Sequence, residues 1–406
     1  MSDRTPIIRR DLEFFPVQHG GRQLILIRDQ LGLVQEGKAV EPSLYTIMIL
    51  LDGTRTIRDL QMELMRQRGG LLVGSDEVES LLASLDESFL LDSEKFQKER
   101  DQIIINFTSN RIRPCAHCGH AYPDNSSELK EKLDEILASQ PTVPDPEGKI
   151  RALISPHIDL SVGYEVYSSA YQVIRHRAPS RVVLLGVGHQ MPEGLFCLTE
   201  KDFETPLGVI KSEQTPVNRL QEAGGDIISG NDFAHRSEHS IEFQLIFLQH
   251  LFAETSFTII PILCGSIQTS LSDYDRKSYL EKAKPFLNEL MQILADPARD
   301  TLLVAGIDFS HIGPKFGHEM PAGYLKGQSE AHDRRLLKYL SGLDADLFWE
   351  ESRSVQDQYN VCGFSTMACL IEVLPPCRGH LLNYQMWHEE ATRSAVSFAA
   401  VVFTSL

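Results

Sequence analysis

The chain has 406 residues, of which 42% are hydrophobic and 23% are charged, and its formal net charge is −17. This length exceeds the ~250–300 residues at which single hydrophobic cores stop growing, so two domains are expected. The acidic balance argues against general nucleic-acid binding, because binding to phosphates needs a concentrated basic face. No run reaches the roughly 18 consecutive apolar residues of a membrane-spanning helix. Residues 1–6 have no apolar core behind their charges, so a cytoplasmic location is expected.

Seven cysteines are scattered through the chain, at positions 115, 118, 197, 264, 362, 369 and 377. An odd number in a large chain is typical of reduced, buried or metal-bound thiols and not of a disulfide framework. Cys115 and Cys118 form a Cys-x-x-Cys pair with His117 and His120 nearby, which allows a zinc or a redox interpretation. No second Cys-x-x-Cys completes a zinc knuckle, so the role of this pair is left open.

Residues 1–98 differ in pattern from the rest of the chain and predict a winged-helix domain. The predicted elements are a hairpin of strands 23–27 and 31–34, helices at 42–51, 56–69 and 75–90, and a wing at 90–96. Ser75 is the expected N-cap of the third helix, because Asp76 and Glu77 follow it where the helix dipole favours negative charge. The charged run at 95–101 predicts the junction into a second domain, expected over residues 111–406.

Three apolar runs of the second domain each end in a side chain suited to metal binding or acid–base chemistry. They are residues 152–155 before Pro156 and His157, residues 181–188 before His189, and residues 301–307 before Asp308 and His311. In an open α/β sheet, ligands bind at the carboxyl ends of the strands. The 32 residues from His157 to His189 match the length of one βαβ unit, roughly 30 or more. A right-handed crossover should therefore place both imidazoles at one edge of a parallel sheet.

The segment from residue 235 to residue 252 combines histidines with a helical pattern that predicts packing on the sheet. Its first turn holds Glu238, His239 and Glu242. Acidic residues in a first turn complement the helix dipole, whereas histidines at 235 and 239 have no such explanation and favour a functional role. The further predicted elements are helices at 127–137, 165–175, 272–294 and 325–340, strands at 257–264, 381–387 and 395–403, and a proline-rich loop at 140–148.

Cys362 and Gly363 stand just before an apolar helix that ends near residue 374. A thiol near a helix N-terminus has its thiolate stabilised, which suits a nucleophile or a ligand for a soft metal. A buried structural cysteine is the alternative explanation.

From residue 111 onward, the motifs and their order resemble the Memo family. The motifs are His117-x-Gly119-x-x-Tyr122, Ser155-Pro-His157, Leu185-Gly-x-Gly-His189, Thr205-Pro-Leu-Gly208, Glu238-His239-Ser-Ile-Glu242, Pro261-Ile-Leu-x-Gly265, Ile307-Asp308-Phe-Ser-His311-x-Gly313 and Cys362-Gly363. The branch they resemble most is called AmmeMemoRadiSam system protein B. The resemblance implies an α/β fold similar to the class III extradiol dioxygenases, with a mostly parallel sheet flanked by helices.

The same resemblance implies an iron(II) or copper site held by His157, His189 and Cys362. Imidazole and thiolate ligands suit Fe(II), Cu(I) or zinc, and three protein ligands leave positions open for O₂ or a substrate. Extradiol enzymes use a carboxylate as the third ligand, so the thiolate leaves open an oxidation other than ring cleavage, or no catalysis.

Further polar residues match those that line the site in this family, namely His239, Asp308 and His311. His239 is the candidate general base, and Asp308 or Glu242 would orient it by accepting its other N–H. The chain departs from the family pattern at residues 158–160, which read Ile-Asp-Leu instead of Ala-Gly-Tyr, and at Gln190, which replaces a second histidine. These departures affect the surroundings of the implied ligands and the choice of substrate.

Residues 51–60 and 90–96 are similar to winged-helix domains related to the pyrroloquinoline-quinone peptide chaperone. Such domains hold peptides for radical SAM enzymes, and the family name implies a radical SAM protein and an AMMECR-like protein as partners. Two functions stay open. One is a metal-dependent oxidoreductase that works with these partners. The other is a non-catalytic module that binds a peptide or partner and stores or delivers metal. A third interpretation is a ligand-binding cleft that has lost its function.

Overall fold

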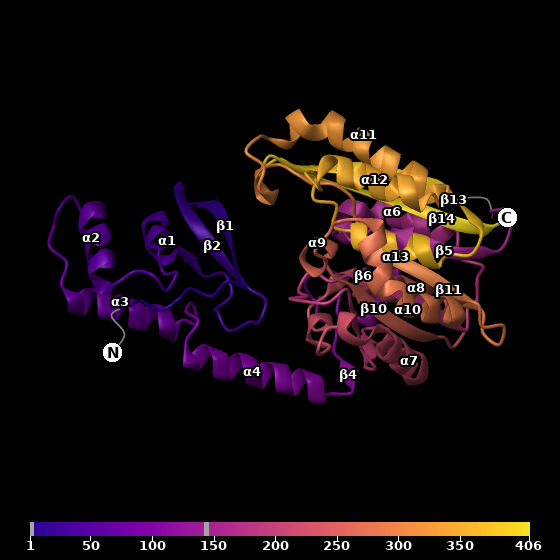
Figure 1. The fold of residues 1–406 in the computed structure, drawn as a ribbon, viewed down its shortest axis with the longest axis horizontal. Coiled ribbons are helices and arrows are strands. Elements are labelled where there is room, and N and C mark those ends of the chain that lie inside the picture. Colours follow the sequence, from indigo (N-terminus) through magenta and orange to yellow (C-terminus); the bar gives the residue numbers. More distant parts are fainter. Residues whose placement is uncertain (1–3, 142–145) are drawn as a thin grey trace. The chain divides into compact units, whose positions relative to one another are not determined.

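The computed structural model (Figure 1) describes residues 4–141 and 146–406, and it divides into two compact units, Met1–Ser109 and Asn110–Leu406. Within the described ranges, no helix is both long and apolar enough to cross a membrane. The predicted proline-rich loop at 140–148 lies partly outside the described residues.

The first unit contains a small antiparallel sheet and several helices. Its elements are β1 (Leu12–His19), β2 (Arg22–Asp29), β3 (Ala39–Val40), α1 (Pro42–Met48), α2 (Ile57–Gln67), α3 (Ser75–Glu87) and α4 (Glu94–Ser109). Strands β1 and β2 pair through a turn at Gly20 and Gly21, both with positive φ, as a two-residue hairpin turn requires. Ile47, Leu60 and Val78 have no exposed surface, so this unit has a core of its own.

The hairpin of the first unit lies earlier in the chain than predicted. Residues 31–34 do not form its second strand, because the Asp29 carboxylate accepts hydrogen bonds from the backbone N–H groups of Leu31, Leu33 and Val34 at 2.8–3.0 Å. These bonds fold the chain into a turn directly after β2. Arg9 closes the same region through a buried ion pair with Asp29 at 2.6 Å.

Two further predictions for this unit are wrong. Residues 90–96, all of which the structure describes, do not form the expected wing. Leu91 makes only an isolated bridge with Ile8, and α4 begins at Glu94. Helix α4 then runs through the segment predicted as a junction. Ser75 is the first residue of α3 and not its N-cap, a position that Gly74 occupies.

The second unit is built on a mixed eight-stranded sheet flanked by helices. In order across the sheet, the strands are β12 (His311–Ile312), β14 (Ser394–Ser405), β5 (Ile150–Ser155), β11 (Thr301–Gly306), β6 (Arg181–Val187), β10 (Thr258–Cys264) and β7 (Phe196–Leu198), with β13 (Cys377–Glu389) paired to β14. The four central strands, β5, β11, β6 and β10, are parallel, whereas the outer strands are antiparallel. The expected α/β fold is confirmed, with the parallel pairing confined to the centre of the sheet.

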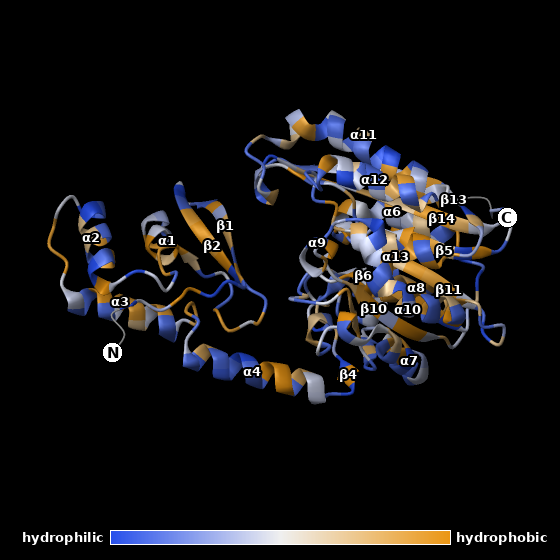
Figure 2. Ribbon diagram, in the orientation of Figure 1, coloured by the Kyte–Doolittle hydropathy of each residue, from blue (hydrophilic) through white to orange (hydrophobic). Residues whose placement is uncertain are grey.

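Helices cover both faces of this sheet and create two hydrophobic cores. One face carries α5 (Ser126–Leu137), α6 (Leu160–Gln172) and α8 (His239–Leu251), and the other carries α7 (Gln214–Gly224), α10 (Arg276–Leu294), α11 (Ala322–Ser341), α12 (Ala345–Val355) and α13 (Phe364–Val373). Along β6, Val182 and Leu184 enter the first core, and Val183 and Leu185 enter the second. Burial on both faces explains the unbroken apolar runs of the central strands, drawn orange in Figure 2.

Most predicted elements of the second unit occur within a few residues of their expected bounds. Helix α6 starts at Leu160 instead of residue 165, because the Asp159 side chain caps it by accepting the backbone N–H of Ser161 at 2.8 Å. Helices α7, α9 (Ile267–Ser270) and α12 were not predicted. Neither was a small second sheet, formed by β4 (Ile112–Arg113), β8 (Asp202–Thr205) and β9 (Gly208–Ile210).

Candidate metal site

The ends of three central strands bring the predicted site residues to one edge of the sheet. His157 follows β5, His189 follows β6, and Asp308 follows β11, which lies between those two strands. Cys362 reaches the same edge from the start of α13, where the backbone N–H of Gly363 donates to the carbonyl of Asp308 at 3.1 Å. The parallel pairing therefore gathers residues that lie up to 205 positions apart in the sequence.

His157, His189 and Cys362 form a cluster in which one ligand atom from each residue lies within 4.8 Å of the others. The Cys362 Sγ atom is 3.5 Å from Nε2 of His157, and the two imidazole centroids are 5.1 Å apart. Metal–nitrogen and metal–sulfur bonds of about 2.0–2.3 Å place two ligands of one ion no more than about 4.6 Å apart. The 3.5 Å between Cys362 Sγ and His157 Nε2 is within this limit, and the chemistry of the three donors suits iron, copper or zinc.

His157 is held with its Nε2 atom toward the cluster. Its Nδ1 atom lies 3.0 Å from the carbonyl oxygen of Gly306, and its backbone N–H donates to Asp308 Oδ1 at 3.0 Å. Burial, and then the neighbouring His189, lower the pKa of His157 to about 4. The ring is thus neutral at neutral pH, which is the form that binds a metal through a nitrogen lone pair.

His189 is positioned by the carboxylate of Glu238. Its Nδ1 atom lies 3.0 and 3.1 Å from the two Glu238 oxygens, and its backbone N–H donates to the same carboxylate at 3.2 Å. Burial would lower the pKa of His189, but the carboxylate outweighs this effect and raises it well above its ordinary value. Conversely, burial would raise the pKa of Glu238, and His189 holds it well below its ordinary range. A carboxylate that holds the second nitrogen of a histidine is typical of metal sites.

Glu238 was predicted in the first turn of a helix but was given no role at the metal site. It is the N-cap of α8, and its side chain also accepts the backbone N–H of Ser240 at 2.9 Å. This capping role is the ordinary explanation for an acidic residue in that position, and it concealed the contact with His189. The signal for a second role was the adjacent His239.

His239 completes a group of three neighbouring imidazoles. Its ring centroid lies 5.0 Å from that of His157 and 5.1 Å from that of His189. Burial lowers the pKa of His239 to about 3, which leaves the ring neutral and able to accept a proton. Its Nδ1 atom lies 3.4 Å from Glu238 Oε1, so the neighbouring carboxylate is Glu238, where Asp308 or Glu242 was expected.

Asp308 and His311 lie next to the cluster. Burial raises the pKa of Asp308 to about 6, and its Oδ2 atom is 3.7 Å from Nε2 of His157. The Nδ1 atom of His311 lies 3.0 Å from the carbonyl oxygen of Phe309, and its ring packs edge-on against Phe316 at 4.9 Å. Burial lowers the pKa of His311 to about 4.

Glu242 has a different place from the one expected. Its buried carboxylate forms an ion pair with Arg113, accepts the hydroxyl of Tyr122, and accepts the backbone N–H groups of Ala116 and His117 at 3.0 and 2.9 Å. These contacts fully engage the carboxylate. Glu242 therefore anchors the segment around residues 113–122 to α8, and the structure does not place it among the residues of the metal cluster.

The close approach of α8 to the sheet depends on two glycines at the strand ends. A Cβ atom on Gly186 would lie 2.6 Å from Ser240 Oγ, and one on Gly306 would clash with the carbonyl oxygen of Ser240. Instead, Ser240 Oγ accepts the backbone N–H of Val187 at 3.0 Å. The first turn of α8 thus contacts both β6 and β11, which brings Glu238 and His239 to the strand ends.

Together, the fold and the cluster define an α/β protein with a candidate metal site of two imidazoles and one cysteine thiol at the carboxyl ends of the parallel strands in a mixed sheet. The Memo-like protein family model matches residues 113–402. This match covers most of the chain, which therefore belongs to the Memo family.

Relatives that match across 99% of their own length support this assignment. A MEMO1 family protein from Aquifex aeolicus is 33% identical over 399 residues, covering 97% of this chain and 99% of the relative. A MEMO1 family protein from Thermus thermophilus is 28% identical over 357 residues, which cover 86% of this chain and 99% of the relative. One from Nitrosopumilus maritimus is 27% identical over 308 residues and covers 72% of this chain but 99% of its own length. More than a quarter of this chain thus has no counterpart in that relative.

Proposed function

We propose that this chain is a metal-dependent oxidoreductase that binds iron(II) or copper through His157, His189 and Cys362. The observation that carries the proposal is the convergence of these three donors within 4.8 Å, with Glu238 fixing the orientation of His189. The resemblance to the AmmeMemoRadiSam branch, and through it to the extradiol dioxygenases, supports a redox role. It also supports a radical SAM protein and an AMMECR-like protein as partners.

The chain's own residues have distinct tasks in this proposal. A bound iron or copper ion would supply electron exchange with O₂ or a substrate. Glu238 accepts the hydrogen bond of the His189 Nδ1–H group, so Nε2 would be the donor atom once it gives up its proton on metal binding. His239, neutral and beside the ligand imidazoles, can accept a proton from a substrate at the site. Asp308, with a pKa of about 6, can hold or release a proton at physiological pH.

Cobalt(II) tests the ligand set, since its spectrum reports thiolate coordination. Wild-type protein loaded anaerobically should show a sulfur-to-cobalt charge-transfer band in the near ultraviolet. Cys362→Ser should lose this band, and Cys369→Ser should keep it, because Cys369 is fully buried in α13 and outside the cluster. A wild-type spectrum without the band would exclude Cys362 as a ligand.

Oxygen uptake separates an oxidoreductase from a metal carrier. Protein loaded with iron or copper should consume many equivalents of O₂ per chain when a reductant such as ascorbate is supplied. Stoichiometric metal binding without turnover would refute the oxidoreductase proposal and favour the metal storage or delivery role.

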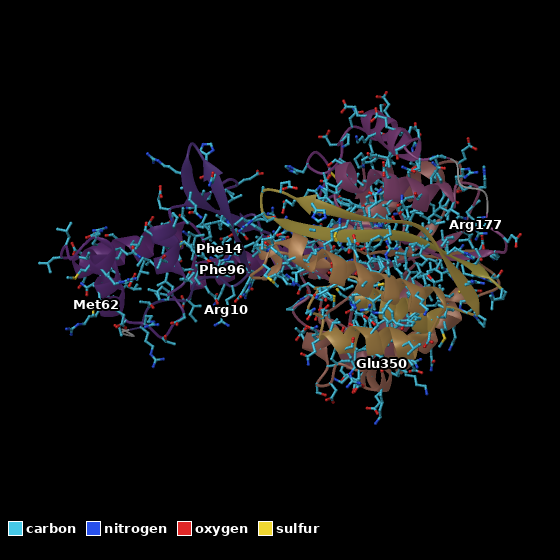
Figure 3. The ribbon with its side chains drawn as sticks, turned by 90° about the horizontal axis from the view of Figure 1, so that it is seen from above. Arg10, Phe14, Met62, Phe96, Arg177 and Glu350 are labelled. Atoms are coloured by element: carbon cyan, nitrogen blue, oxygen red, sulfur yellow. A yellow bond between two sulfur atoms is a disulfide. The ribbon has the colours of Figure 1, made fainter. Side chains whose placement is uncertain are left out.

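A peptide-binding or partner-binding role is our second proposal, and exposed apolar side chains in the first unit favour it. Met62 on α2 is 64% exposed, and Leu71 and Leu72, in the loop before α3, are 68% and 88% exposed. Figure 3 shows Met62 projecting away from the body of its unit. Exposed apolar side chains of this size can contribute to an interaction surface. Leu71→Glu with Leu72→Glu should weaken binding of a purified radical SAM partner, and unchanged binding would remove this surface from the proposal.

A further inference from the structure

The Cys-x-x-Cys pair forms a local disulfide in the segment that Glu242 anchors. Cys115 and Cys118 are bonded to each other, with their Cα atoms 6.0 Å apart, between β4 and α5. Both residues are partly exposed. A dithiol reagent can therefore reach a bond that lies on the surface of the second unit.

The two residues enclosed by this disulfide both donate hydrogen bonds to Glu242. The backbone N–H groups of Ala116 and His117 donate to its two carboxylate oxygens, Oε2 at 3.0 Å and Oε1 at 2.9 Å. This bidentate arrangement requires both N–H groups to point in one direction, which constrains the backbone between the cysteines. Opening the disulfide removes a covalent restraint on that backbone.

His117 connects the disulfide loop to the metal cluster. Its Nε2 atom lies 2.9 Å from the carbonyl oxygen of Ser237, and its ring centroid is 5.7 Å from that of His239. Ser237 and His239 flank Glu238, which holds His189. A change in the position of His117 thus acts on the residues that border the cluster.

The surroundings favour a redox role for the cysteines over a zinc role. Their sulfur atoms bond to each other, and the ring nitrogen of His117 already contacts Ser237. Cysteines separated by two residues are the common arrangement for thiol–disulfide exchange.

We propose that Cys115 and Cys118 are a reversible dithiol–disulfide pair that exchanges with a small-molecule or protein dithiol and sets the position of His117 beside His239. A thiolate of the donor attacks one sulfur, breaks the Cys115–Cys118 bond and forms a mixed disulfide. The donor's second thiol then attacks the donor sulfur of this mixed disulfide and displaces the cysteine that is still bonded to it. Two electrons and two protons pass from the donor, which leaves as a disulfide, to the chain, which gains two thiols. The exchange goes beyond the proposed metal chemistry and does not depend on it.

A redox titration tests the exchange on the full-length protein. The protein is equilibrated with graded ratios of reduced and oxidised dithiothreitol, and its free thiols are then trapped with a maleimide. Mass spectrometry measures the fraction of the peptide containing residues 115 and 118 that carries the maleimide. We expect one two-electron transition while circular dichroism stays native. Cys118→Ser should abolish the transition, and Cys377→Ala, which alters a buried cysteine elsewhere, should leave it unchanged. A pair that stays oxidised until the protein unfolds, or stays reduced in oxidised dithiothreitol and oxidised glutathione, overturns the proposal.

Histidine resonances test the effect on the site without any metal. In metal-free protein labelled with ¹³C-histidine, reduction should shift the ring signals of His117 and His239, assigned through His→Gln variants. The signal of His250, at the far end of α8 and bonded to Asp134, should stay in place. An unchanged His239 signal overturns the coupling to the site. Because no metal is present, failure of the oxidoreductase proposal and failure of this inference give separate results.

Discussion

Nδ1 of His189 lies 3.0 and 3.1 Å from the two carboxylate oxygens of Glu238, and this pair links a strand end to a helix start. His189 is 32% exposed at its side chain, whereas Glu238 is 2% exposed. The buried Glu238 carboxylate therefore fixes the Nδ1 side of the partly exposed His189 ring. Through its bond to Ser240, the same carboxylate caps α8 and brings His239 to the cluster.

Glu238→Gln should weaken metal binding by about 10–100-fold, the typical effect of removing such a carboxylate partner. The amide can still accept a hydrogen bond, so the cap of α8 is retained in part, but the charge that holds the proton on His189 is lost. Isothermal titration with zinc or cobalt(II) measures the change. Glu204→Gln, on an exposed position of β8, is the control and should bind like wild type. Equal affinity in the two variants would remove Glu238 from the site.

Gly363→Ala should destabilise the protein by about 1–3 kcal/mol, the usual cost of forcing atoms into a packed region. A Cβ atom at this position would lie 2.7 Å from both the Asp308 carbonyl oxygen and Ile307 Cβ. Gly327→Ala is the matched control. It is exposed in α11 with open space around it, so alanine should stabilise by about 0.5–1 kcal/mol. Urea unfolding measures the free energy of unfolding of both variants. A Gly363→Ala variant as stable as wild type would contradict the close contact between α13 and the end of β11.

The pH dependence of stability should include a contribution from Glu213. Its carboxylate pairs with Arg181 at 2.8 Å and with Arg299 at 2.6 Å. Burial would raise the pKa of Glu213, but the arginines outweigh it and lower the pKa below the ordinary value of 4.5. A lowered folded-state pKa means that the stabilisation is complete above the unfolded-state value and is lost as pH falls through the folded-state value.

Glu213→Gln should therefore lower the free energy of unfolding by about 1–3 kcal/mol at pH 7, as expected when the charged hydrogen-bond partner of the buried Arg181 is removed. The cost should shrink as the pH is lowered well below 4.5, where the wild-type carboxyl is also protonated. Urea unfolding at several pH values measures it. Glu281→Gln removes an exposed ion pair with Lys277 and should change little at any pH. A cost for Glu213→Gln that does not vary with pH would contradict this assignment.

A chain that lacks residues 1–109 should fold and unfold cooperatively. The second unit has two cores of its own, and the Memo-like family match begins at residue 113. Differential scanning calorimetry of the truncated chain would show one cooperative transition. Its absence would mean that the first unit is required for folding.

The sequence predicted the parts of the site that depend on strand ends. Apolar runs followed by His157, His189 and Asp308 were recognisable, because strands buried on both faces leave continuous apolar segments. The placement of Cys362 beside them came only from the family resemblance. Local patterns do not reveal that α13 packs on the end of β11.

Two other features were not predicted, for different reasons. The partners of Glu242 include Arg113 and Tyr122, which lie 129 and 120 residues away in the sequence. In the first unit, residues 31–34 have strand-like composition, yet the carboxylate of Asp29 turns the chain there. In the first case a tertiary contact decides where the side chain lies, and in the second a local turn, closed by hydrogen bonds between residues two to five positions apart, outweighs strand-like composition.

The metal content of protein purified without oxygen tests the central claim most directly. Elemental mass spectrometry should find close to one iron or copper ion per wild-type chain. Cys362→Ala should lose most of this metal while keeping its native circular dichroism, and Cys369→Ala should retain it. Wild-type metal content in Cys362→Ala would contradict the assignment of His157, His189 and Cys362 as the ligands.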